Sequence, residues 1–214
     1  MEFLHQGKEL TAAFPFFGPA NSKTLKNTIK QEGFREPTFP ELTSFVHNYF
    51  DGTGESSEKI SEIMKTKYFV GFTGVLYMPD RNEILFIDYP AFDRGSVVDV
   101  NDLTMRLKMN QVRAMVSLDD VETGSVPWNK IAKNPLFQAV GGGEEGAEKL
   151  AELASRHSDK KGHIFVPKTS NFTSPQARIT LLYSYERGKS LTVTLNGSGY
   201  SINSYSPGLI GATS

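Results

Sequence analysis

Apolar side chains recur every three or four residues in the first half of the chain, which is the spacing of one helical face. The pattern is strongest after Thr38, which forms a capping box with Glu41 that satisfies the free amides of a helix start. We therefore predict a helix beginning at Thr38, with one apolar face made by Leu42, Phe45, Val46, Tyr49 and Phe50. The same spacing predicts shorter helices over residues 22–31 and 57–65.

The period then changes to that of β-strands. Residues 68–77 and 84–90 are mostly apolar and flank the turn 78–83, so they predict a β-hairpin with two buried strands. Gly71 and Gly74 in the first of these strands indicate a bend or the close approach of another backbone. Further strands are predicted over residues 112–118 and 163–167.

Residues 101–109 fit two patterns. Asp99 or Asn101 can cap a helix there, whereas the apolar side chains alternate as they would in a strand, at Leu103, Met105, Leu107 and Met109. Of the two, we favour the helix. Pro127 and the pair Asn134–Pro135 each mark the start of another helix.

The carboxyl-terminal third predicts a second hairpin, with strands over residues 177–185 and 190–195, and a turn at Asn196–Gly197 into residues 199–205. Helices and antiparallel strands are grouped rather than alternating. We therefore predict an α+β fold, with a mostly antiparallel sheet packed against helices and a carboxyl-terminal β-meander. Residues 1–37 contain three prolines around one helical stretch, and they predict an irregular amino-terminal arm ahead of a single domain, residues 38–214.

Composition narrows the classes of function. The 214 residues carry a formal net charge of -1, so no global positive field attracts nucleic acid in general. Cysteine is absent, which excludes thiolate nucleophiles and cysteine-ligated metals and fits a reducing compartment. The first ten residues lack the apolar run of a secretory signal, and no apolar stretch approaches the roughly 18 residues of a membrane-spanning helix. These features predict a cytoplasmic protein without a transmembrane segment.

The glycine spacing of a dinucleotide-binding turn is matched by Gly141, Gly143 and Gly146. Such a turn follows a strand, whereas here the preceding apolar residues follow the helix start Asn134–Pro135. Glu144 and Glu145 stand where phosphates would bind, and their charge opposes an anion. We interpret the glycines as a loop between two helices and predict no nucleotide cofactor.

Residues 51–62 resemble a calcium loop in spacing, with carboxylates at Asp51, Glu55 and Glu62. However, Ser56 stands where the sharp turn of such a loop requires glycine, and Glu58 stands where an apolar residue usually packs. We therefore predict an exposed acidic loop and no bound metal.

One set of candidate catalytic residues remains. Asp88 ends a buried strand, Asp93 and Arg94 follow in the next loop, and carboxylates held at strand ends are suited to acid–base catalysis. The alternative is a solvated Asp93–Arg94 pair in a turn. His163, at a strand start, is the one histidine expected to act as a base.

The other histidines predict structural roles. His47 lies off the apolar face of its helix and is expected in solvent. His157 lies near the carboxyl end of a helix, where the helix dipole stabilises a positive charge.

Tyrosines in the carboxyl-terminal third form a candidate binding surface, because tyrosine combines a large apolar body with a polar tip. The residues are Tyr185, Tyr200 and Tyr205, and the alternative is that they close the edge of the core. Lys23, Lys26 and Lys30 share one face of the first helix. A membrane-surface or RNA-binding arm uses such lysines, but three are few, and we favour an arm docked on the domain with a solvated lysine face.

Two functions follow. We favour a binding or interaction domain for a protein partner or for self-association, which would expose an aromatic patch. The alternative is a small hydrolase-like enzyme using Asp88, Asp93, Arg94 and His163. That enzyme would bring at least two of these side chains within hydrogen-bond distance in a cavity.

Overall fold

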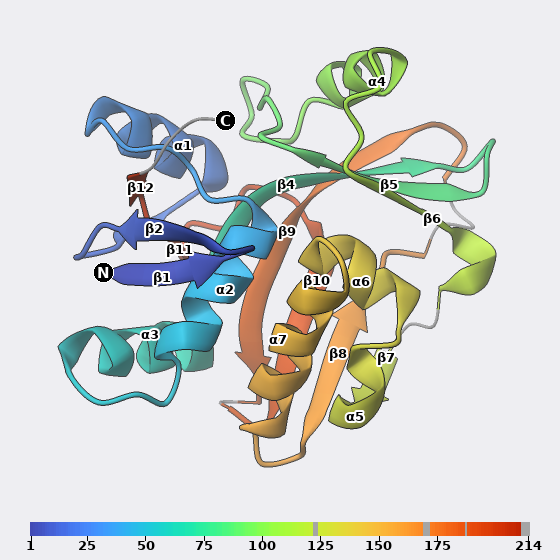
Figure 1. Cartoon of the computed structure of the whole chain (residues 1–214). Coiled ribbons are helices and arrows are strands. Elements are labelled where there is room, and N and C mark those ends of the chain that lie inside the picture. The colour runs from blue at the N-terminus through green and yellow to red at the C-terminus, as the bar shows by residue number, and fades with distance from the viewer. Residues whose placement is uncertain (122–123, 169–171, 187, 211–214) are drawn as a thin grey trace.

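The computed structural model describes residues 1–121, 124–168, 172–186 and 188–210, and Figure 1 shows helices on both sides of a central twisted sheet. The helices are α1 (Ser22–Gln31), α2 (Phe39–Tyr49), α3 (Glu55–Thr66), α4 (Val100–Lys108), the 3-10 turn η1 (Leu118–Asp120), α5 (Trp128–Ile131), α6 (Pro135–Gly141) and α7 (Glu144–Ser155). The strands are β1 (Glu2–His5), β2 (Lys8–Ala12), β3 (Phe17–Ala20), β4 (Tyr68–Met78), β5 (Glu83–Asp88), β6 (Ala114–Ser117), β7 (Gly124–Pro127), β8 (Lys161–Phe165), β9 (Gln176–Tyr185), β10 (Ser190–Gly197), β11 (Ser204–Ser206) and β12 (Leu209–Ile210).

The main sheet has the strand order β3-β11-β4-β9-β10-β8-β7, and β5 pairs with β4 and carries β6 at its other edge. The β4–β5 and β9–β10 hairpins are antiparallel, as are most pairs; β8–β10 and β4–β11 are parallel. A small second sheet joins β1, β2 and β12. The predicted α+β class, with a mostly antiparallel sheet packed against helices, is confirmed.

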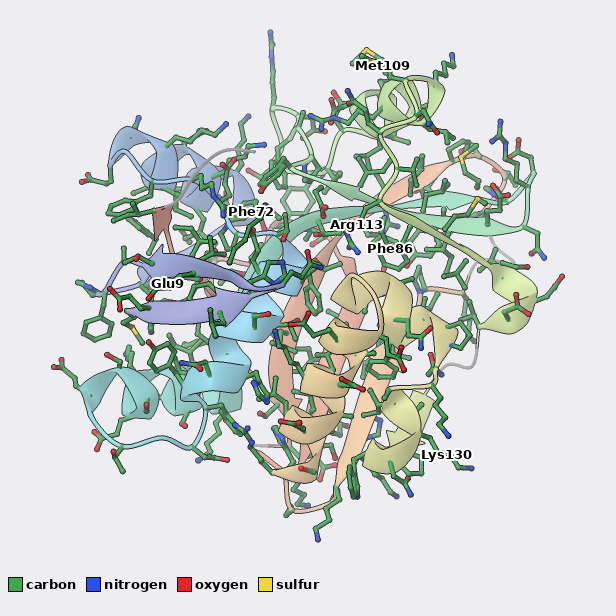
Figure 2. The ribbon with its side chains drawn as sticks, in the orientation of Figure 1. Glu9, Phe72, Phe86, Met109, Arg113 and Lys130 are labelled. Carbon is green, nitrogen blue, oxygen red and sulfur yellow. The ribbon has the colours of Figure 1, made fainter. Side chains whose placement is uncertain are left out.

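The sheet buries apolar side chains on both faces. One face packs with α2, α3, α6 and α7 around Phe45, Leu150 and Leu182, and the other packs with α1 and α4 around Ile29, Phe72 and Leu103. Figure 2 shows Phe72 and Phe86 in the interior, whereas Lys130 points outward from α5. Strand β4 lies between the two cores, and it is buried from Phe69 to Met78.

Helix α2 begins as the capping box predicts. The Thr38 hydroxyl accepts from the Glu41 amide at 3.4 Å, and the Glu41 carboxylate accepts from the Thr38 amide at 2.8 Å. The first turn of α2 crosses β4 at Gly71, where an added Cβ would lie 2.5 Å from the Phe39 Cα. The close approach expected at Gly71 is therefore confirmed, and the register of β4 against β9 shifts between Gly71 and Gly74.

The glycine-rich stretch is a helix–loop–helix, as interpreted from the sequence. The Asn134 side chain caps α6 by accepting from the amides of Leu136 and Phe137 at 3.0 and 3.2 Å. Helices α6 and α7 then meet backbone to backbone, because a Cβ on Gly146 would lie 1.9 Å from the Gly141 carbonyl oxygen. The glycine spacing serves this contact between two helices.

Residues 101–109 are mostly helical, and the Asp99 side chain caps α4, as favoured from the sequence. Residues 55–62 also lie in a helix, α3, so the acidic segment does not form a calcium-type loop. No strand was expected at β7, whose four residues are too few to show an alternating pattern.

The two ends of the chain differ in detail from the prediction. Residues 1–37, expected as an irregular arm, contain β1, β2, β3 and α1, and they add Phe3 and Leu25 to the two cores. Asn196 and Gly197 belong to β10 rather than to a turn, and β11 pairs with β3 and β4 instead of extending the meander. Long-range pairing decides these segments, and a local pattern does not report it. Arg187, in the predicted turn between β9 and β10, lies outside the described residues.

Among the helices of the described residues, none combines the length and the apolar character needed to span a membrane.

Candidate functional site

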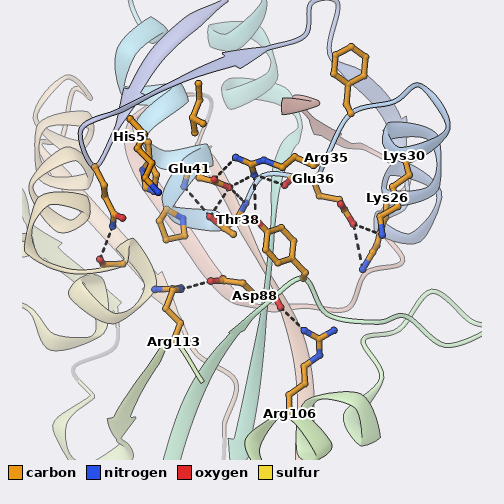
Figure 3. Close-up of a pocket in the computed structure, with 17 residues that line it drawn as sticks. His5, Lys26, Lys30, Arg35, Glu36, Thr38, Glu41, Asp88, Arg106 and Arg113 are labelled. Carbon is orange, nitrogen blue, oxygen red and sulfur yellow. Dashed lines mark hydrogen bonds and ion pairs between the residues drawn. The ribbon is translucent and has the colours of Figure 1, made fainter. Parts of the chain in front are cut away.

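A cavity of about 720 Å³ opens where the small sheet, α1, α2 and the end of β5 meet (Figure 3). Its walls come from segments that are far apart in the sequence. The charged and polar side chains that line it are His5, Gln6, Lys8, Lys26, Lys30, Arg35, Glu36, Thr38, Glu41, Asp88, Tyr89, Arg106 and Arg113. Leu10, Phe34 and Pro40 supply apolar surface.

Arg35 and Glu41 form a two-point ion pair in the wall of the cavity (Figure 3). Burial disfavours the Glu41 carboxylate, but hydrogen bonds from Arg35 and Thr38 more than offset it, and the pKa of Glu41 is lowered. The capping box that starts α2 therefore also holds the guanidinium of Arg35 in place.

Glu36 is a buried carboxylate that faces two lysines. Its Oε1 lies 3.6 Å from the Lys26 Nζ and 3.4 Å from the Lys30 Nζ, and it has no hydrogen-bond partner among the described residues. Lys26 also donates to the Pro90 carbonyl oxygen at 2.7 Å, and burial lowers the pKa of its ammonium group. Lys30 is exposed, so much of its charge faces the cavity mouth and solvent.

Asp88 connects three parts of the fold. Its Oδ1 accepts from the Thr73 hydroxyl, which itself accepts from the Phe39 amide at the start of α2. Its Oδ2 lies 2.9 Å from the Nε of Arg113, and Arg106 donates to its carbonyl oxygen at 3.2 Å. Figure 3 shows Arg106 and Arg113 approaching Asp88 from different elements. The Asp88 carboxylate is therefore already neutralised by Arg113.

Tyr89 takes a strained conformation at the same place. Its φ of 56° lies in the left-handed region, which bulky side chains seldom occupy, and such strain is often found at ligand sites. Arg35 donates to its hydroxyl at 3.4 Å, and burial raises the pKa of Tyr89 to about 12. The phenol is therefore a neutral group at the cavity wall at physiological pH.

The charge of the cavity is positive. Six cationic side chains line it, namely Lys8, Lys26, Lys30, Arg35, Arg106 and Arg113, against the three carboxylates Glu36, Glu41 and Asp88. The excess of three positive charges among the lining side chains contrasts with the net charge of -1 for the whole chain, although Arg106 also pairs with Asp102, a carboxylate outside the lining, at 3.1 Å. Lys8 has no ion-pair partner within the described part of the chain. A cleft with an excess of one sign of charge attracts ligands of the opposite sign.

The described residues contain no group of three or more carboxylate or imidazole side chains arranged to hold a metal ion.

No family model and no curated protein matches this chain. A solved structure matches it over 94% of this chain and 97% of its own, with a TM-score of 0.60 and 14% sequence identity. That structure concerns the accommodation of massive sequence variation in Nanoarchaeota by the C-type lectin fold. This chain has a similar fold. At this identity the likeness extends to the architecture alone.

Of the four predicted catalytic residues, only Asp88 lines the cavity. Asp93 accepts from the amides of Gly95 and Val97 at 2.8 and 3.0 Å, and the Arg94 side chain is exposed in the same loop. His163 lies on β8 and stacks on Phe165. Within the described residues, no hydrogen bond or ion pair joins any two of the four, so the geometry gives the catalytic set no shared site.

The three predicted binding tyrosines lie on different elements. Tyr185 ends β9, is 45% exposed and packs beside His163, with ring centroids 5.9 Å apart. Tyr200 is 56% exposed, and its hydroxyl lies against Gly95. Tyr205 is partly buried on β11 and packs against the core. Tyr205 lines a cavity that neither Tyr185 nor Tyr200 reaches.

His157 differs from the sequence interpretation. It is buried against Phe50 and shares hydrogen bonds of 2.7 Å with the Leu153 carbonyl oxygen and with the Ser184 hydroxyl. Burial lowers its pKa, so the neutral ring is favoured. The largest influence on its pKa is therefore burial rather than the helix dipole expected from the sequence. His47, expected in solvent, is partly buried and pairs with Glu152.

The three lysines of α1 share one helical face in the sequence, but the groups they contact depend on the tertiary structure. Lys26 and Lys30 turn toward Glu36 and the cavity, whereas Lys23 donates to the Asp93 carbonyl oxygen at 2.7 Å. The helix is docked on the domain, as favoured, but its lysine face is not simply solvated, because Lys26 is largely buried beside Glu36. The missed signal is Glu36 itself, an acidic residue six positions after Lys30 and beyond the end of α1, whose carboxylate lies near both lysines.

Proposed function

We propose that this protein is a non-catalytic binding domain whose cavity takes a small anionic ligand. The observation that carries the proposal is the excess of three positive charges on the cavity wall in a chain that is slightly negative. Lysine and arginine donate charge-assisted hydrogen bonds to carboxylates and phosphates, which are about twice as strong as neutral ones. Lys8 and Lys30 supply charge that the protein does not fully neutralise.

The size and the remaining walls fit the same ligand class. The volume of about 720 Å³ lies within the roughly 300–1,000 Å³ of small-molecule sites. Phe34, Leu10 and Tyr89 offer apolar surface for an organic part, and the neutral Tyr89 hydroxyl can donate a hydrogen bond. The solved structure with a similar fold is noted for accommodating sequence variation, which fits a scaffold whose binding sites are set by individual side chains.

Isothermal titration calorimetry with citrate and inorganic pyrophosphate tests the proposal, with glycerol as the neutral control. We expect at least one anion to bind with a Kd below about 1 mM at low salt, and binding to weaken as ionic strength rises. The double variant Lys8→Ala/Lys30→Ala should weaken affinity at least tenfold. Lys130→Ala, a lysine on α5 outside the cavity, is the matched control and should change nothing.

No anion binding at about 10 mM, or equal affinity in the double variant and in the parent, contradicts the proposal. The hydrolase alternative remains a prediction without a converging set of side chains. Partner binding or self-association through Tyr185, Tyr200 and Tyr205 remains a prediction for the outer surface of the same domain.

A further inference from the structure

Strand β6 lies at an edge of the main sheet. Among the described residues it pairs with β5 along one side, and its other side has no strand partner. Its register with β5 runs from Glu83 opposite Ser117 to Phe86 opposite Ala114. The Leu118 amide donates to the Asn82 carbonyl oxygen at 2.8 Å. Because bonded residues alternate along an antiparallel pair, the amides of Met115 and Ser117 point away from β5. Such an edge is a template for another extended segment.

A groove of about 530 Å³ lies beside this edge. It is lined on one side by β6 and on the other by α6 and the loop that follows it, through Ala114, Met115, Val116, Ser117, Pro135, Gln138, Ala139 and Gly143. Arg113 and Gly142 line both this groove and the cationic cavity. The groove and the cavity therefore adjoin at the amino-terminal end of the strand, and the Arg113 guanidinium, which donates to the carbonyl oxygens of Ala139 and Val140 at 2.7 and 3.4 Å, lies between them.

The two ends of the groove carry opposite charge. The cavity, with its excess of cationic side chains, lies at the Arg113 end, whereas Asp120 lines the groove beyond Ser117. A strand that adds to β6 in the antiparallel sense has its own carboxyl end beside Arg113. Its amino-terminal part then lies beside Asp120, so the charges of a free peptide match both ends of the groove.

We propose that the anionic ligand is the carboxyl-terminal end of an extended peptide, which pairs with the edge of β6 and places its terminal carboxylate beside Arg113, at the boundary of the cationic cavity. The inference rests on the proposed function, because it uses the same cavity. At about 3.4 Å per residue, the four residues of β6 pair with a peptide segment of similar length. Main-chain hydrogen bonds supply affinity there, and the carboxylate sets direction and specificity.

Fluorescence anisotropy with a labelled peptide, Lys-Thr-Val-Thr-Val-Glu with a free carboxyl terminus, tests the inference on the full chain. We expect this peptide to bind at least tenfold more tightly than citrate, and the same peptide with a carboxyl-terminal amide to bind at least fivefold more weakly than the free acid. N-methylation of one alternate set of peptide amides should abolish binding, while N-methylation of the other set should leave it unchanged, because only one set faces β6.

The matched protein variants are Met115→Pro and Met115→Ala. Proline removes an amide that faces away from β5, a position at which edge strands tolerate proline. We expect Met115→Pro to weaken peptide binding at least tenfold and to leave citrate or pyrophosphate binding within twofold of the parent. Met115→Ala removes the same side chain but keeps the amide, and it should bind the peptide as the parent does.

The outcomes separate the inference from the proposed function. If small anions bind but the peptide binds no more tightly, or if both N-methylated peptides behave alike, the strand pairing is wrong and the anion cavity stands. If the peptide binds equally well to Met115→Pro, its backbone does not pair with β6. If neither the anions nor the peptide bind, both proposals are wrong.

Discussion

Arg35 and Glu41 meet through two parallel contacts, Nη2 to Oε1 at 2.7 Å and Nη1 to Oε2 at 3.0 Å. The Glu41 Oε2 atom that accepts from Nη1 also accepts from the Thr38 amide. The Glu41 side chain therefore both caps the start of α2 and holds the Arg35 guanidinium in the cavity wall. The planar fork of arginine makes such two-point pairing possible, and lysine does not reproduce it.

Replacing Arg35 with alanine leaves Glu41 charged and largely buried without its main partner. We expect the free energy of unfolding to fall by about 3 kcal/mol, as is found when one member of a buried pair is removed. Arg35→Lys should recover part of that loss, because a single charge contact replaces the fork. Urea unfolding followed by circular dichroism measures the change, with the exposed Arg81→Ala as the control. Equal losses for Arg35→Ala and Arg81→Ala would contradict the role assigned to the pair.

The buried His157 predicts a loss of stability in mild acid. Burial lowers its pKa in the folded state below the ordinary value of 6.5, so below that pH the unfolded chain binds more protons than the folded one. The free energy of unfolding should therefore decrease as pH falls through 6.5 toward the folded pKa. Burial lowers the pKa of His5 and His163 as well, which adds to the trend.

Urea unfolding at pH 7.5 and pH 5.5 checks this expectation, and His157→Gln separates the contribution of the residue. The variant should lose about 1–3 kcal/mol at pH 7.5, because the Ser184 hydroxyl loses its partner and Phe50 loses its stacked ring. Its further loss between pH 7.5 and pH 5.5 should be smaller than in the parent. A variant with the same pH dependence as the parent would show that His157 does not titrate in this range.

Gly146→Ala tests the backbone contact between α6 and α7. The added Cβ would lie 1.9 Å from the Gly141 carbonyl oxygen, and only a shift of one helix relieves the overlap. Alanine favours a helix more than glycine does. If the two helices were not in contact, the substitution would therefore raise the free energy of unfolding by about 1 kcal/mol. We expect a net loss of about 3 kcal/mol in the free energy of unfolding instead. Glu148→Ala, an exposed position on α7, is the control, and a Gly146→Ala variant as stable as the parent would mean that the helices are not in contact.

Tyr185→Ala and Tyr200→Ala test the predicted association surface. Both side chains are exposed, so each substitution should change the free energy of unfolding by no more than about 0.5 kcal/mol. If the tyrosines take part in self-association, sedimentation velocity should show a weaker complex for each variant than for the parent. Tyr205→Ala should cost more stability, because its ring packs against the core. Identical sedimentation of all four proteins would remove the tyrosines from any self-association surface.

Elements whose start signals are local were predictable from the sequence. Thr38 and Glu41 are three residues apart, and Asn134 caps the amides of the next few residues, so both helix starts follow from short-range hydrogen bonds. The hairpin β4–β5 was predictable because a short turn joins two long apolar strands.

The cavity was not predictable, because its walls depend on tertiary pairing. Lys8, Asp88 and Gly142 come together only after the small sheet, the β5 end and the α6 loop have packed around α2. The pair Asp88–Arg113 depends on β5 and β6 being neighbours, which no local pattern reports. Asp88 was singled out correctly as a strand-end carboxylate, but the sequence does not show that an arginine neutralises it.

The position of β4 between the two cores has a consequence for hydrogen exchange. It pairs with β9 along one side and, toward its two ends, with β11 and β5 along the other, and its side chains are buried from Phe69 to Met78. Solvent therefore reaches its hydrogen-bonded amides only when the whole sheet opens. The central amides of β4 should be the last to take up deuterium, and their protection factors should report the full free energy of unfolding rather than that of a local fluctuation.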